Sequence, residues 1–275
     1  MLSTTAVAPT TSASAAASAP AAAQRPAYRC GMDVFGHTAS GRIKFRRVEN
    51  ARVEVSKTSR GTVDWRPISW ALVSLNRWPG TETTNQLVAA TDGKVRLVET
   101  EWHTGSALDV RVSKIVGRGY PSRRVSVTDG HIYWVAADGS LHRKTWNGAR
   151  FVRPMKLPVS LSTATAMTAL ETDFGRLVYY TDRAGALHVV ADDGPNSTDT
   201  VLRSSGYGKI TGLRVGSCIS RDYSGQRYDL GLLSVNRKRG VARFQRALRA
   251  AAAEPGRVTK AVRVRPSDWT WRRLG

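Results

Sequence analysis

Five residues that can carry positive charge stand at one equivalent position, the third residue after each of five glycines. In chain order they are Lys44, Arg96, His142, His188 and Arg243. Such side chains bind carboxylates, phosphates and sulfates, and the two histidines would strengthen that binding on protonation below about pH 6.5. They would then form a band of contacts for a sugar or a polyanion. The alternative is that these are the water-facing positions of strands, which this chain fills with basic residues.

Three tryptophans stand in polar, turn-like contexts: Trp78, Trp102 and Trp146. A tryptophan held on a loop can stack its face on a pyranose ring, while neighbouring Asn, Thr and His residues supply hydrogen bonds. Alternatively, each of the three fills a groove between packed sheets. We expect the core to hold the tryptophans of strand-like runs: Trp65, Trp70 and Trp134.

Carboxylates that could serve catalysis are present but lack a recognisable arrangement. A glycosidase needs a pair of acids, one of them a proton donor. The candidates are Asp33, Asp92, Asp138, Asp182, Glu99, Glu101 and Glu171. Most of these aspartates stand in turns, where a structural role is sufficient. The motifs Gly-x-Ser-x-Gly, His-Glu-x-x-His and Cys-x-x-Cys do not occur. We therefore expect no metal, no cofactor and no catalytic residue, and favour a binding protein over an enzyme.

The elements that position these residues are predicted by a repeat. The glycines Gly41, Gly93, Gly139, Gly185 and Gly240 are 52, 46, 46 and 55 residues apart. Each ends a short polar turn, with apolar residues before it and alternating apolar and polar residues after it. Alternation predicts a strand with one buried face, so each unit is a hairpin. A period near 46 is typical of one four-stranded propeller blade.

Further strand-like runs fill the intervals, at 71–75, 110–112, 125–127, 201–202 and 262–264. The 248 residues from Tyr28 to Gly275 allow five units of about 50. We predict an all-β fold over residues 28–275, a five-bladed β-propeller of four-stranded blades. Its ring would be closed by the N- and C-terminal strands, with the alternating residues 268–273 pairing with the first blade.

Residues 132–143 resemble the repeat of tachylectin-type five-bladed β-propellers, and residues 177–189 and 87–98 are further copies. The resemblance covers three units well and extends more weakly to the first and fifth. It implies a lectin-like protein that binds N-acetylated sugars in equivalent pockets between blades. No set of sugar-contacting residues can be matched position by position, so no binding site is carried over from the family.

Residues 1–27 consist almost entirely of Ala, Ser, Thr and Pro. The alanines before Gln24 fit the small residues that precede a signal-peptidase cut, although no Lys or Arg precedes residue 25. We expect a signal-peptide remnant or a flexible linker. Cys30 and Cys218 would lie in the first and last blades, which are neighbours in a closed ring. A disulfide between them is expected if the protein is exported; two separate buried thiols are the alternative.

The chain of 275 residues carries 42 Lys and Arg against 21 Asp and Glu, a net charge of +21. That charge favours a polyanionic partner, whereas coding bias toward arginine is the competing explanation. We expect a secreted, monomeric, non-enzymatic protein that binds glycans or polyanionic cell-surface polymers in pockets between blades. Nucleic acid is a less favoured partner, and no apolar run is long enough to span a membrane. The alternatives are a glycoside hydrolase and a protein-interaction scaffold.

Overall fold

The computed structural model describes residues 28–78, 81–103, 107–121, 123–220, 228–249, 254–265, 268–269 and 273–274. This part of the chain is nearly all β-strand, with two 3-10 turns, η1 (Gly194–Asn196) and η2 (Arg237–Arg239). Within it, no helix has the length and apolar character needed to cross a bilayer. The chain is thus an all-β protein, as its alternating pattern predicts.

Antiparallel hairpins between successive strands form five groups, which we call the first to fifth meanders. The first contains β1 (Tyr28–His37), β2 (Arg42–Glu49) and β3 (Arg52–Thr62), with β21 (Arg273–Leu274) on β1. The second contains β4 (Pro67–Trp78), β5 (Thr81–Ala90), β6 (Val95–His103) and β7 (Leu108–Gly117). The third contains β8 (Val125–Val127), β9 (His131–Val135), β10 (Ser140–Trp146) and β11 (Phe151–Ser160).

The fourth meander contains β12 (Ala164–Thr172), β13 (Gly175–Asp182), β14 (Leu187–Asp192) and β15 (Thr198–Arg203). The fifth contains β16 (Gly212–Ser220), β17 (Leu230–Asn236) and β18 (Val241–Leu248), with β19 (Arg257–Val258) and β20 (Val262–Val264) both on β18. The first meander is also paired with the fifth through β1 and β16, and with the second through β3 and β7. Two of the strands predicted from sequence, 125–127 and 262–264, match β8 and β20 residue for residue.

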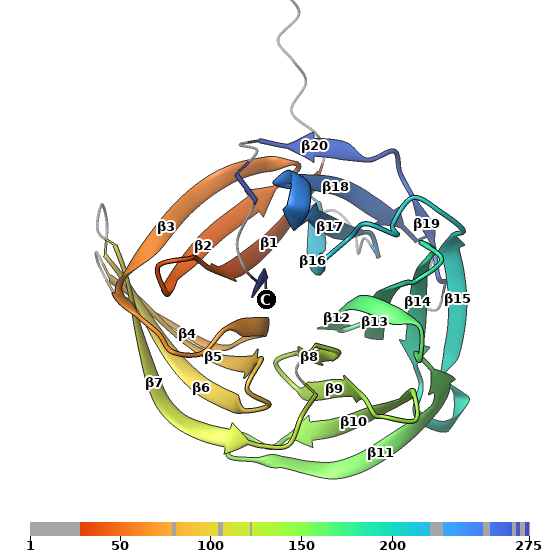
Figure 1. The fold of residues 1–275 in the computed structure, drawn as a ribbon, viewed down its shortest axis with the longest axis horizontal. Helices are drawn as coiled ribbons and strands as arrows, with labels where there is room; N and C mark the ends of the chain where they lie inside the picture. Colours follow the sequence, from red (N-terminus) through yellow and green to blue (C-terminus); the bar gives the residue numbers. More distant parts are fainter. Residues whose placement is uncertain are drawn as a thin grey trace, which may run out of the picture.

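The meanders are arranged around a common axis, with β1, β4, β8, β12 and β16 on their inner sides and the short β21 beside β1 near the axis (Figure 1). These five inner strands contact one another in order: β1 with β4, β4 with β8, β8 with β12, β12 with β16, and β16 with β1. The last contact is an antiparallel pairing of residues 28–30 with residues 218–220. Sheet edges near the axis are therefore covered by neighbouring meanders.

Five buried apolar clusters hold the meanders together, and each cluster draws on two neighbouring meanders. Ile43 and Trp70 belong to the cluster between the first and second meanders, and Leu87 and Ile132 to the next. Two further clusters join the third to the fourth and the fourth to the fifth meander. The remaining one combines Val34 of β1 with residues of the fifth meander and includes Trp269. The core is thus distributed over the junctions, which is how packed sheets bury their faces.

The turns predicted from the sequence are confirmed, because each of the five glycines lies between the two strands of a hairpin. All five glycines have positive φ angles, between +60° and +90°. A side chain is strained in that conformation, which explains why glycine recurs there. The carbonyl of each glycine also accepts a backbone N–H from a residue that follows the outer strands. The donors are Val63, Tyr120, Leu161, Tyr207 and Trp269, at 2.8–3.3 Å. The five meanders are therefore equivalent units.

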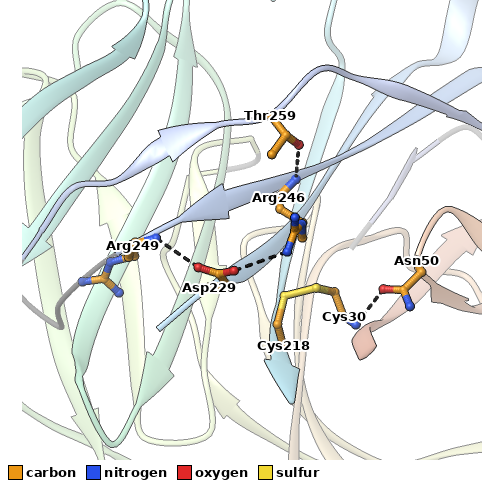
Figure 2. Close-up of a disulfide and its surroundings, with 7 residues drawn as sticks. All are labelled: Cys30, Asn50, Cys218, Asp229, Arg246, Arg249 and Thr259. Carbon is orange, nitrogen blue, oxygen red and sulfur yellow. Dashed lines mark hydrogen bonds and ion pairs between the residues drawn. A yellow bond between two sulfur atoms is a disulfide. The ribbon is translucent and has the colours of Figure 1, made fainter. Parts of the chain in front are cut away.

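A disulfide joins Cys30 of β1 to Cys218 of β16, as predicted, and the two residues face each other in register. Figure 2 shows the polar contacts around it: the Asn50 side chain accepts the Cys30 N–H at 2.9 Å, and Asp229 accepts from Arg246 at 3.5 Å. The predicted strand 268–273 is seen only at its end, where Arg273 pairs with His37; residues 270–272 lie outside the described part of the chain.

Candidate functional site: a basic cleft between two meanders

The five residues predicted to form a cationic band occupy equivalent places on the second or third strand of their meanders: Lys44 on β2, Arg96 on β6, His142 on β10, His188 on β14 and Arg243 on β18. Their surroundings differ. Lys44 is half-buried. Arg96 is buried, donates to Asp92 at 3.0 Å and lies 5.3 Å from the Trp65 ring centroid. The charge of Arg96 is therefore already paired with an acidic residue of its own hairpin.

The two histidines are also engaged locally. His142 stacks on Trp134 with ring centroids 5.2 Å apart, and its Nε2 lies 2.8 Å from the Ser140 hydroxyl. His188 stacks on Tyr180 at 4.4 Å, with the carboxylates of Asp182 and Asp199 at 3.5 and 3.4 Å from its ring nitrogens. These contacts are made inside the third and fourth meanders, and they orient the imidazoles along their strands.

The tryptophans predicted as stacking platforms are placed differently from one another. Trp146 is buried, with 8% of its surface exposed, in the cluster between the second and third meanders. Its ring has no free face for a sugar, so Trp146 fills the groove, as in the alternative given above. Trp102 is half-buried, lies edge-on to Phe45 at 4.2 Å and donates to Thr100 at 3.1 Å. The side chain of Trp78 lies outside the described residues. Trp65 and Trp70 are core residues, as predicted.

The acidic candidates do not converge in the described part of the chain. The five inner strands there carry two carboxylates, Asp33 and Glu171. Asp33 accepts from Arg47 at 2.9 Å, and Glu171 lies 2.8 Å from the His131 ring. The hydrogen bond from His131 lowers the pKa of Glu171 despite partial burial. Glu171 is therefore not held in the protonated form that a glycosidase proton donor requires. The described residues also contain no group of His, Cys, Asp and Glu that could hold a metal ion.

Arg243 lines a cleft of about 1010 Å³ between the fourth and fifth meanders, formed by the segment after β15 together with residues of β17, η2, β18 and β20. The cationic residues around it are Arg203, Lys209, Arg239, Arg243, Lys260 and Arg263. The uncharged polar residues are Ser205, Tyr207, Ser234, Asn236 and Gln245. None of the lining residues is acidic. The cleft therefore presents hydrogen-bonding groups and positive charge together.

Strand register positions the centre of this cleft. Ser234 of β17 faces Arg243 of β18, and Arg243 faces Arg263 of β20. Residues directly opposite one another in antiparallel strands share a face, so these three form one row across three strands. The alternate residues Ala242 and Val264 are buried on the other face, in the core with Trp269. The buried face fixes the register and so keeps the row in the cleft.

The floor of the cleft is held by Tyr207, one of the five donors to a turn glycine. Its N–H bonds to the Gly185 carbonyl at 3.0 Å, and its hydroxyl donates to Gln245 at 2.6 Å. The Gln245 amide in turn donates to the Thr259 carbonyl at 2.7 Å. Burial raises the pKa of Tyr207, although the Gln245 bond and the nearby charges of Arg203 and Arg243 oppose that shift. The floor is thus a fixed, uncharged hydrogen-bonded platform.

Five of the six cationic residues around the cleft lack an acidic partner among the described residues. Within the described residues, Arg203, Lys209, Arg239, Arg243 and Lys260 make no ion pair with any acidic side chain. Arg243 and Arg263 are like charges directly opposite each other, an arrangement that destabilises a sheet. A concave surface of one sign concentrates the field of its charges. The arrangement therefore attracts anions.

Sequence reasoning found Arg243 but missed Arg203, Tyr207, Lys209 and Lys260 as parts of the same site. One signal was available, because basic residues become denser after the turn 237–239. The segment 203–209 gives no comparable signal: its place beside the fifth meander follows from the packing of two meanders.

No protein-family model matches the sequence. No curated protein matches it either. Solved structures similar to the chain include the fucose-specific lectin from Aleuria aurantia, which is 11% identical with a TM-score of 0.47, covering 87% of this chain and 79% of that one. The SapL1 lectin in complex with alpha methyl fucoside is 13% identical with a TM-score of 0.47, covering 86% and 79%.

A third similar structure is the WD40 domain of SCAP from fission yeast, which is 8% identical with a TM-score of 0.35. The match covers 80% of this chain but 52% of that one, so the chain spans about half the length of that protein. At these identities and TM-scores the three likenesses say nothing about what this chain binds. Membership of the tachylectin-type family stays a prediction.

Proposed function

We propose that residues 28–275 form one five-bladed β-propeller whose blades are the five meanders, and that the protein is a secreted, non-enzymatic binding module. Its ligands are glycans or anionic cell-surface polymers, bound between blades. The observation that carries this proposal is the cleft of about 1010 Å³ between the fourth and fifth meanders. Ligand sites are typically concave, largely pre-formed and equipped with a few converging polar groups, as this cleft is.

Two further observations support parts of the proposal. The cyclic order of contacts among the inner strands, with β16 returning to β1, supports a closed ring. The Cys30–Cys218 disulfide supports export, because thiols stay reduced in the cytosol of most organisms. Residues 1–27 would then be a leader, which mass spectrometry of the mature secreted protein would detect as a missing segment.

A glycan array tests the function, with the full chain as probe. We expect signals for a subset of glycans, and no release of sugar from those that bind. A blocking variant tests the location: Gly208→Trp places a large side chain at the cleft, where an added Cβ meets only ordinary contact with Gly185. Ala137→Trp, on an exposed turn of the third meander, is the matched control.

Gly208→Trp should abolish the array signals, and Ala137→Trp should preserve them. An array without signal at any salt concentration would refute the binding function. Hydrolysis of a bound glycan would refute its non-enzymatic character, and equal binding by the two variants would remove this cleft as the site.

A further inference from the structure

We propose that the cleft selects an acidic oligosaccharide, a saccharide that carries sulfate or carboxylate groups. The inference rests on the proposed function, since it names the ligand class of the same cleft. Its centre is the row Ser234, Arg243 and Arg263 across β17, β18 and β20. Arg243 is exposed in the cleft and makes no ion pair with an acidic side chain of the described residues. An acidic group of a bound saccharide can therefore meet its guanidinium.

Further cationic residues surround this row, and they come from three other segments of the chain. Arg203 comes from the end of β15, Arg239 from η2, and Lys260 from the link between β19 and β20. These segments belong to two meanders, so their cations approach a ligand from opposite walls of the cleft. A neutral sugar would leave five of the cleft cations without an acidic partner: Arg203, Lys209, Arg239, Arg243 and Lys260. An acidic saccharide would compensate several of them, and guanidinium groups bind carboxylate and sulfate oxygens through paired, charge-assisted hydrogen bonds.

The shape and composition of the cleft favour a saccharide over a nucleic acid. Sites for single-stranded nucleic acids combine positive charge with exposed aromatic rings on which bases stack. Tyr207 is the aromatic residue among the lining residues, and it is 4% exposed with its hydroxyl bonded to Gln245. No stacking platform is therefore offered by the lining residues. The exposed Ser205 and the half-buried Asn236 instead supply small polar groups, which suit sugar hydroxyls.

Calorimetric titration of the full chain tests the inference with three named probes. They are a heparin-derived sulfated hexasaccharide, a neutral chitin hexasaccharide, and a single-stranded DNA oligonucleotide of the same charge as the first. The sulfated hexasaccharide should bind most tightly. Its affinity should fall steeply between 50 and 300 mM salt, because the ligand displaces counterions. The neutral hexasaccharide should bind at least about tenfold more weakly.

Matched variants locate the binding. Arg243→Ser with Lys260→Ser removes two cleft cations, and Lys114→Ser with Arg183→Ser removes two exposed cations that do not line the cleft. The first pair should weaken binding of the sulfated hexasaccharide about 10- to 100-fold and lower the salt slope by about one to two. The second pair should leave both unchanged. Arg243 lies in β18 and Lys114 in β7, whereas Lys260 and Arg183 lie outside strands, so each pair contains one strand residue. Folding is checked by the thermal midpoint of each variant.

The outcomes separate this inference from the function it rests on. Tighter binding of the chitin hexasaccharide, blocked by Gly208→Trp, would refute acidic selectivity and keep the proposed function. If the oligonucleotide bound more tightly than the sulfated hexasaccharide, and Arg243→Ser with Lys260→Ser weakened its binding about 10- to 100-fold, a nucleic acid and not a saccharide would be the ligand class. Equal losses in the two variant pairs would show that net charge, and not this cleft, drives binding. Absence of binding to the sulfated hexasaccharide, with signals still present on the glycan array, would refute the acidic class and keep the proposed function.

Discussion

The carboxyl group of Asp192 is fully buried where the third and fourth meanders meet. Tyr133 donates to it at 2.6 Å, and the guanidinium groups of Arg143 and Arg176 lie 2.6 and 3.2 Å away. Burial alone would raise the pKa of Asp192. The bonds from Tyr133 and the Gly194 N–H, with the two guanidinium charges, outweigh burial and hold that pKa below its ordinary value. The fold therefore depends on this carboxylate being ionised.

Replacing Asp192 by alanine should lower the free energy of unfolding by about 3–5 kcal/mol, since it leaves the buried Arg143 without its partner. Asp193→Ala is the matched control, because its neighbouring side chain is exposed and makes no capping hydrogen bond. The control should change stability by less than about 0.5 kcal/mol. Urea unfolding followed by circular dichroism measures both, and equal losses would contradict the role given to Asp192.

Because the pKa of Asp192 is lowered in the folded state, the stability of the fold should depend on pH. A carboxyl whose pKa is lower in the folded than in the unfolded state stabilises the fold fully above the unfolded value, about 3.9 for Asp. That contribution is lost as the pH falls through the lower, folded pKa. The stability difference between the wild type and Asp192→Asn should therefore shrink between pH 6 and pH 3. A difference that stays constant over this range would contradict the assignment.

At the scale of elements, the hairpins could be predicted because their information is local. A polar turn ending in glycine, followed by alternation, fixes a hairpin, and all five occur where expected. The burial of the tryptophans could not be predicted in the same way. Trp146 stands in a polar stretch of sequence, yet it is buried in the cluster that also holds Val95 and Tyr120 of the neighbouring meander. Packing between meanders, which the local sequence does not encode, decided its role.

The cleft could be predicted only in part, for the same reason. The equivalent position after each glycine identified Arg243, but three of its four counterparts, Arg96, His142 and His188, are held by partners of their own. Residues 203–210 and the cleft residues of β17, η2, β18 and β20 come together because the fourth and fifth meanders are adjacent around the axis. A pattern within one strand cannot show which two segments form the opposite walls of a groove.

The link between β1 and β16 should contribute measurably to stability. The disulfide spans 188 residues of sequence, and loop closure of that length restricts the unfolded chain by about 4–5 kcal/mol in the chain-entropy model. Replacing Cys30 and Cys218 by serine should lower the urea midpoint accordingly. A reducing agent should lower the midpoint of the wild type but not that of the variant. Identical midpoints for the oxidised wild type and the variant would contradict the stabilising role.

For the whole molecule, the net charge of +21 implies self-repulsion in the folded state. Raising the salt concentration from 20 to 300 mM shortens the Debye length from about 20 Å to under 8 Å and so screens that repulsion. The thermal midpoint of unfolding should therefore rise with salt, while affinity for an acidic ligand falls. A midpoint that decreases over this range would show that attractive ion pairs outweigh repulsion in this chain. Differential scanning calorimetry measures the midpoint directly.

The cross-link between neighbouring strands also determines how the molecule responds to mechanical force. If residues 28 and 274 were pulled apart, tension would reach Cys30 and Cys218 and pass through their bond. The four meanders enclosed between the two cysteines would carry no load, so only the segment after Cys218 could unravel. Its contour length is roughly 200 Å at full extension. After reduction, the same stretching experiment would draw out the entire chain.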